Sequence, residues 1–308
     1  DMRQQLLKLL ISGSLHSGIF ESALSYIEEY GSVRAPPCTA DVAVPPARLP
    51  LDVLLLGLQA HMGLGRAAEA AAVLVRDMEP QPGCSPAVVK AALSNLLPAP
   101  LEQLSSALPA ITACLLACLA RCRRAEEAGS RAAAAAAAWP PTAGAELVLM
   151  VATAVASHEG PTAEGHLLNL LAHDDVVAAI CHATDPRDRL HRLLYARATA
   201  AYHQADHASS ARLFAAALLY ASGGGGAPYC RTARMLSNCY AAMGQPRRAL
   251  GYLDLAAAHE PHTVTHLLLR LRLLLSLQEA AEQGHAAGTQ AAVSLALGVG
   301  GAAGRGME

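Results

Sequence analysis

The chain has 308 residues and a formal net charge of −2, and 53% of its residues are apolar although only 4% are aromatic. Because no basic block is present, composition argues against a groove that tracks nucleic-acid phosphates, which relies on clustered Lys and Arg. Most of the apolar residues are Ala and Leu, which favour helices, and β-branched residues are too sparse to build a sheet. Composition therefore predicts an all-α protein.

The first half of the chain repeats one pattern, a Leu-rich helix followed by a short break and an Ala-rich helix. Residues 1–30 show this pattern with Gly18 at the break, and residues 51–78 show it with Gly65. Each such helix has an apolar stripe wider than one partner can cover, so that stacked helix pairs are required to bury it. We therefore expect helical hairpins in this half of the chain.

Two further hairpins are predicted before residue 190, and a loop separates the first two. In 110–139 the break is placed near Arg123 and Arg124, and in 145–172 it is placed at the sequence Glu-Gly-Pro that ends at Pro161. Residues 31–50 contain five prolines, which exclude a continuous helix and indicate a surface loop.

The strongest repeat signal is the stretch MLSNCYAAMGQPRRALGYLDLAAAHEP at 235–261, after a weaker unit at 193–221. Small residues recur where two helices would approach closely, large residues fill the wider gaps, and a Pro closes the segment. These offsets match the tetratricopeptide (TPR) pattern of about 34 residues. The matching positions are Leu236, Ser237, Tyr240, Gly244, Ala249, Leu253, Ala256 and Pro261.

We therefore predict a TPR-like helical-repeat solenoid, a right-handed superhelix of antiparallel helix pairs. Residues 1–190 would form degenerate Ala-rich hairpins, 191–297 TPR-like repeats and 298–308 a flexible tail. The chain begins with Asp and ends in a Gly-rich stretch, so it is expected to be a segment of a longer protein.

Residues 200–280 contain a characteristic order of features: an aromatic-plus-Ala helix at Phe214, the pair Cys239-Tyr240, the stretches QPRRAL, YLDLA and HEP, and a Leu-rich helix at 267–277. In this order they resemble the meiotic TPR scaffolds of the Zip-four/sporulation-twenty-two family. The resemblance implies a non-enzymatic scaffold in the nucleus, associated with chromosomes, that couples crossover formation to synapsis. Its implied partners are meiotic axis or crossover proteins.

A different set of polar residues points to a partner-binding groove. In TPR co-chaperones a basic residue and an Asn one turn apart on the first helix hold a partner's terminal carboxylate. Arg234 and Asn238 are likewise one turn apart. A co-chaperone or complex-assembly adaptor in the cytoplasm is therefore the alternative function. The candidate groove for an acidic or helical peptide comprises Arg231, Arg234, Asn238, Arg270 and Arg272.

No catalytic, cofactor or metal site is predicted, and no membrane, nucleic acid or small molecule is expected as a direct partner. Cys114, Cys118 and Cys122 share a helix face and are interpreted as packed thiols, with a metal site as the alternative. His203 and His207 stand four residues apart but fall in a break between helices, and the sequence His-Asp-Asp at 173–175 lacks the other ligands of a di-metal site. A metal-dependent hydrolase on a helical bundle is thus the remote alternative.

Overall fold

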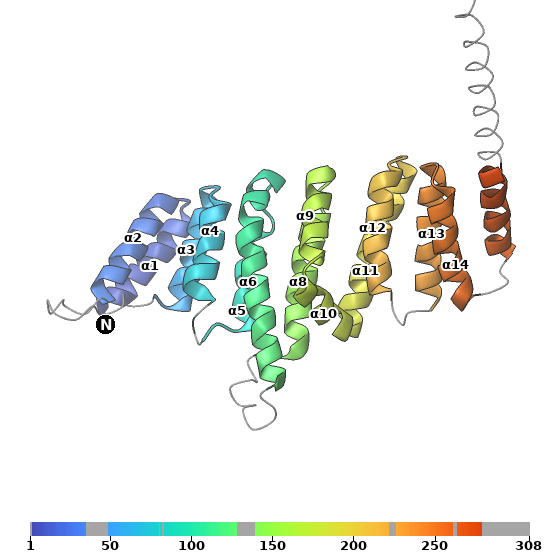
Figure 1. The fold of residues 1–308 in the computed structure, drawn as a ribbon. Coiled ribbons are helices and arrows are strands. Elements are labelled where there is room, and N and C mark those ends of the chain that lie inside the picture. The colour runs from blue at the N-terminus through green and yellow to red at the C-terminus, as the bar shows by residue number, and fades with distance from the viewer. Residues whose placement is uncertain are drawn as a thin grey trace, which may run out of the picture. The chain divides into compact units, whose positions relative to one another are not determined.

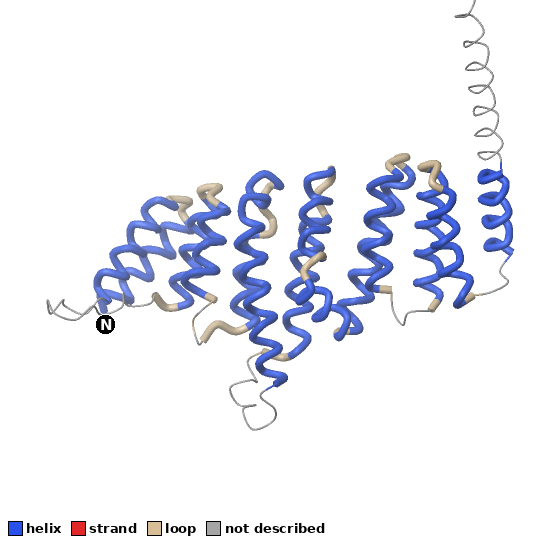
Figure 2. The backbone as a smooth tube through the Cα atoms, in the orientation of Figure 1, coloured by secondary structure: helices blue, strands red, loops and turns tan. Residues whose placement is uncertain are grey.

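The structure is a computed structural model that describes residues 2–34, 49–79, 81, 83–127, 139–221, 226–260 and 264–278. Within these ranges every regular element is a helix and no strand occurs (Figure 2), so the prediction of an all-α chain is confirmed. The chain divides into two compact units, residues 1–193 and 194–308. Several expectations concern residues outside these ranges: residues 35–48 of the predicted loop, Pro261, the last part of the repeat region and the tail at 298–308.

The described helices are arranged along the chain as Figure 1 labels them. Unit 1 contains α1 (Met2–His16), α2 (Phe20–Arg34), α3 (Leu51–Gly63), α4 (Ala67–Val73), the π-helical turn η1 (Leu74–Met78), α5 (Pro86–Leu96), α6 (Leu101–Glu127), α8 (Pro141–Ala156), α9 (Pro161–Leu171), α10 (Asp174–His182) and the first half of α11 (Thr184–His203). Unit 2 contains the end of α11, then α12 (His207–Tyr220), α13 (Ala227–Ala242), α14 (Pro246–His259) and a helix at 264–278.

Four of the connections are the same turn. In each, one residue has a positive φ, between +61° and +72°, and the next residue's N–H donates to the carbonyl five residues before it. This is the bond pattern of a Schellman motif, which satisfies carbonyl groups at a helix end and favours glycine. The predicted breaks at Gly18 and Gly65 are therefore confirmed, and so is the turn at Gly244. The fourth residue of this kind is Ala205, between α11 and α12.

The predicted break near Arg123 and Arg124 is wrong, because α6 continues through both residues to Glu127. Neither Gly nor Pro stands there, arginine is a good helix former, and Leu119 and Cys122 continue the buried face of the helix up to this point. The break lies instead before α6, between Leu96 and Leu101. The other expected break of this region is confirmed, since α8 ends at Ala156 and α9 begins at Pro161.

The segment Leu101–Ala125 of α6 is long and apolar enough to cross a membrane, alone in this among the described helices. A core helix of a soluble protein passes the same test. In unit 1 this helix contacts α4, α8, α9 and α10, and Leu104, Ile111 and Cys118 on it are fully buried. Its apolar character is thus used, at least along this face, in packing against other helices.

The α13–α14 pair has its small residues where the sequence predicts close approach. Ser237 is 1% exposed and Ala249 is fully buried, and the Ser237 hydroxyl donates to the Ala249 carbonyl oxygen at 2.8 Å. Leu236 and Leu253 are also fully buried, as expected. Tyr240 is only partly buried and stacks on Tyr252 with a ring-centroid distance of 5.3 Å.

Candidate partner-binding surface

Three of the five predicted groove residues lie on α13. Arg231, Arg234 and Asn238 are spaced by three and four residues, which places them along one side of the helix. Arg231 is exposed, and the other two are half-buried. The opposite side of α13 is buried among its neighbours, so the structure presents these three polar groups together.

Arg234 already has a partner within the chain. Its Nη1 lies 2.8 Å from Oε2 of Glu260, the residue that follows α14, and the two side chains are 21% and 29% exposed. A charged pair shielded to this extent is less weakened by water than a fully exposed one. A partner's carboxylate that binds Arg234 would therefore have to displace Glu260 or share the guanidinium with it.

The two arginines of the helix at 264–278 lie on different sides of it. Arg270 is exposed, and its Nη1 lies 3.2 Å from Oδ1 of Asp254 on α14. Arg272 is exposed too, but two residues along a helix correspond to about 200° of rotation. The structure therefore does not place Arg272 beside Arg270.

Tyr195, which sequence reasoning missed, and His266 lie among these arginines. Burial raises the pKa of Tyr195 on α11, and the nearby charges of Arg231 and Arg234 oppose that shift. Burial lowers the pKa of His266, and the positive charges of Arg270 and Arg234 lower it further. These influences show that α11, α13 and the helix at 264–278 bring their polar side chains into one neighbourhood.

His266 has an unusual environment. Its side chain is 3% exposed, and neither ring nitrogen has a hydrogen-bond partner among the described residues. A buried polar group without a partner costs free energy. The grouping of His259, His262 and His266 around Pro261 favours residues of a loop between repeats. That interpretation is wrong for His266, which lies buried in the helix at 264–278.

The helix at 264–278 also carries an exposed apolar face. Six apolar side chains on it are between 48% and 71% exposed. We call these six residues the leucine face: Val264, Leu267, Leu268, Leu271, Leu274 and Leu275.

The expectation that the cysteines of α6 are packed thiols is confirmed for their burial. Cys114 and Cys118 are fully buried, and Cys122 is 5% exposed. Burial raises the pKa of neighbouring Cys84 to about 11, and a hydrogen bond with Cys114, together with burial, raises the pKa of Cys118. Protonated, buried thiols are poor nucleophiles and poor metal ligands.

The two His-containing sequences lie at helix ends. His203 ends α11 and His207 begins α12, and both rings lie against Tyr202, with centroid distances of 6.2 Å and 5.1 Å. In the sequence His-Asp-Asp, Asp174 begins α10 and Asp175 pairs with Arg123. Over the described ranges no three His, Cys, Asp or Glu side chains are grouped so that they could hold a metal ion.

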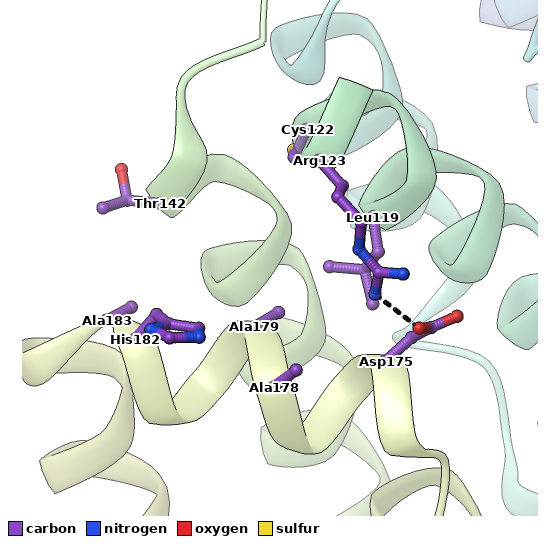
Figure 3. A pocket seen from close by; sticks show the side chains of 9 residues that line it. All are labelled: Leu119, Cys122, Arg123, Thr142, Asp175, Ala178, Ala179, His182 and Ala183. Atoms are coloured by element: carbon purple, nitrogen blue, oxygen red, sulfur yellow. Dashed lines mark hydrogen bonds and ion pairs between the residues drawn. The ribbon is translucent and has the colours of Figure 1, made fainter. Parts of the chain in front are cut away.

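A pocket of about 280 Å³ lies between α6, α8 and α10 in unit 1 (Figure 3). The Arg123 guanidinium reaches across it to Asp175, with 2.5 Å between Nη2 and Oδ1, while His182 and Thr142 stand apart from that pair. The remaining lining is mostly apolar.

Comparison with known proteins adds no assignment. No protein-family model matches the chain, and no curated protein matches it.

Proposed function

We propose that this chain is a non-enzymatic protein-interaction scaffold built from TPR-like helical repeats. The observation that carries the proposal is the fourfold use of one turn between paired helices, with φ between +61° and +72° and the same bond from the next N–H to the carbonyl five residues before it. Proteins built from such hairpins present extended surfaces to other proteins. The Ser237–Ala249 contact between α13 and α14 adds the small-residue crossing expected of a TPR unit.

The proposed setting is meiotic crossover formation and chromosome synapsis in the nucleus. Support for it comes from the resemblance of residues 200–280 to the Zip-four/sporulation-twenty-two family. The net charge of −2 suits a protein that reaches chromosomes through other proteins and not through phosphate contacts. The partners would be axis or crossover proteins.

The test is a pull-down from meiotic cells with the wild-type chain and the double variant Arg234→Glu, Arg270→Glu. Both arginines pair with carboxylates of α14 or the residue after it, so the double reversal repels those carboxylates and any acidic partner. We expect wild type to retain axis or crossover proteins and the double variant to lose them. Arg247→Glu on α14 is the matched control, because Arg247 is exposed in the same unit.

Other outcomes would point elsewhere. Capture of chaperone C-terminal peptides in place of meiotic proteins would favour the co-chaperone alternative. If circular dichroism shows that the double variant loses binding because it unfolds, the single variant Arg270→Glu replaces it. The Arg270–Asp254 ion pair is about half exposed and contributes about 0–1 kcal/mol to stability, so the single variant should remain folded.

A further inference from the structure

The leucine face has the spacing of a helix seam. Val264, Leu267, Leu271 and Leu274 follow one another at intervals of three, four and three residues, and Leu268 and Leu275 widen the stripe. This is the a/d pattern with which one helix packs along another. A helix that is apolar on two sides is normally covered on both.

Among the described residues of unit 2, neighbours cover one side of this helix. Leu269 and Leu273 pack with Ala249 and Leu253 of α14, whereas the leucine face points away from that contact and is exposed. By contrast, α13 packs between α12 and α14. Within the described residues, α13 thus has a helix on each of two sides, whereas the helix at 264–278 has α14 on one side and no described helix over its leucine face.

Charge indicates what fits this face. The helix at 264–278 contains Arg270 and Arg272 and no acidic residue. At 100° per residue the two arginines stand on opposite borders of the leucine face. Arg270 is already paired with Asp254 of α14, whereas Arg272 makes no ion pair with any carboxylate that the structure describes. We propose that the leucine face binds an acidic amphipathic helix of a partner protein, with apolar residues at heptad spacing and carboxylates on the flank that meets Arg272.

A second copy of the chain is a poorer occupant. The five leucines are arranged symmetrically about Leu271, so two copies could match their apolar residues in antiparallel orientation. However, that pairing brings the two Arg272 side chains to one edge of the seam and the two Arg270 side chains to the other. Asp254 of α14 pairs with each Arg270, but the helix supplies no carboxylate to offset the like charges of the two Arg272 side chains. An acidic helix matches the apolar stripe and the charge together.

The test uses the full chain and a synthetic peptide of three heptads with Leu at a and d and Glu at e and g, labelled for fluorescence anisotropy. A second peptide has Lys in place of Glu. We expect the acidic peptide to bind at least about tenfold more tightly than the basic one, because like charges across a seam oppose association. Binding of neither peptide, or equal binding of both, would overturn the proposal.

Two variants locate the binding site. Leu271→Asp should weaken binding of the acidic peptide by about tenfold or more, since central apolar contacts dominate such interfaces. Arg272→Glu should weaken it by about threefold and improve binding of the basic peptide. The matched controls are Leu219→Asp on α12, where the leucine is 64% exposed, and Arg247→Glu. Equal losses in the controls would mean that the peptide does not bind at the leucine face.

Two measurements on the full chain test which occupant covers the face. Light scattering should give a monomer, and amide hydrogens at 267–275 should exchange more slowly when the acidic peptide is added. A dimer abolished by Leu271→Asp would show that a second copy covers the face. In a monomer, exchange unchanged by the peptide would show that the face does not bind it. Either result would overturn the proposal.

The leucine-face proposal rests on the proposed function in one respect: both take the ligand to be a protein, here a helix of a partner. Peptide binding without meiotic partners in the pull-down would retain the leucine face as a binding site and reject the setting. If the variants Leu271→Asp and Arg272→Glu still capture meiotic partners in the pull-down, the result would support the scaffold function and reject the leucine face as the site where those partners bind.

Discussion

Ala205 has the backbone conformation that glycine has in the three other turns of this kind. Its φ is +61°, in the left-handed region that side chains with a Cβ rarely adopt. The turn at Ala205 differs from the others in having Asp206, whose carboxylate accepts the Ser209 N–H at 3.0 Å and caps α12. That bond lowers the pKa of Asp206. A good helix cap thus accompanies a strained residue.

We expect Ala205→Gly to stabilise unit 2 by about 0.5–1 kcal/mol, because relief of the left-handed strain exceeds the extra entropy of glycine in the unfolded chain. Gly244→Ala, at the equivalent place before α14, should destabilise it by about 1 kcal/mol. Urea denaturation of both variants measures the two changes. Changes of the same sign would mean that the two turns are not equivalent.

At the scale of elements, the packing of α2 against α3 depends on one glycine. A Cβ built on Gly63 would lie 2.4 Å from two carbon atoms of the Phe20 ring. Gly251, within α14, has nothing within 4 Å of the same position. The two glycines therefore separate the effect of close packing from that of helix propensity.

Gly63→Ala should destabilise unit 1 by about 1–3 kcal/mol, because the aromatic ring must move out of a packed site. Gly251→Ala should stabilise α14 by about 0.5–1 kcal/mol, because alanine is the better helix former. Thermal unfolding followed by circular dichroism gives both values. A stable Gly63→Ala variant would show that Phe20 rearranges at little cost.

The contrast between Gly65 and α6 shows how far the sequence alone predicts these elements. A glycine between two apolar helical stretches predicts a turn correctly, because the required backbone conformation is nearly unique to it. Arg123 and Arg124 mislead, because two charged residues are as compatible with the surface of a long helix as with a break. Local composition does not distinguish the two cases, whereas packing against α8 and α10 does.

The candidate site was predictable to a similar extent. The spacing of Arg231, Arg234 and Asn238 is sufficient to predict that they share one side of a helix. Their partners are not predictable in this way, since the pairing of Arg234 with Glu260 depends on how α14 returns along α13. The exposure of the leucine face likewise depends on which helix packs where.

At the scale of the whole molecule, the helices of unit 2 are linked mainly through neighbours in the sequence, as α12 contacts α13 and α13 contacts α14. In such an arrangement a local defect should weaken nearby helices more than distant ones.

Ala249→Leu tests this, since Ala249 is fully buried where α13 and α14 cross, and an enlarged side chain there should cost about 1–3 kcal/mol. Hydrogen exchange should show the largest loss of protection in α13 and α14, a smaller loss in α12, and none in α3 and α4. Leu219→Asp, on the exposed side of α12, serves as the control and should leave the exchange pattern unchanged. A uniform loss across both units would show that the chain unfolds as one cooperative body, and no loss in α13 would mean that the crossing at Ala249 tolerates the larger side chain.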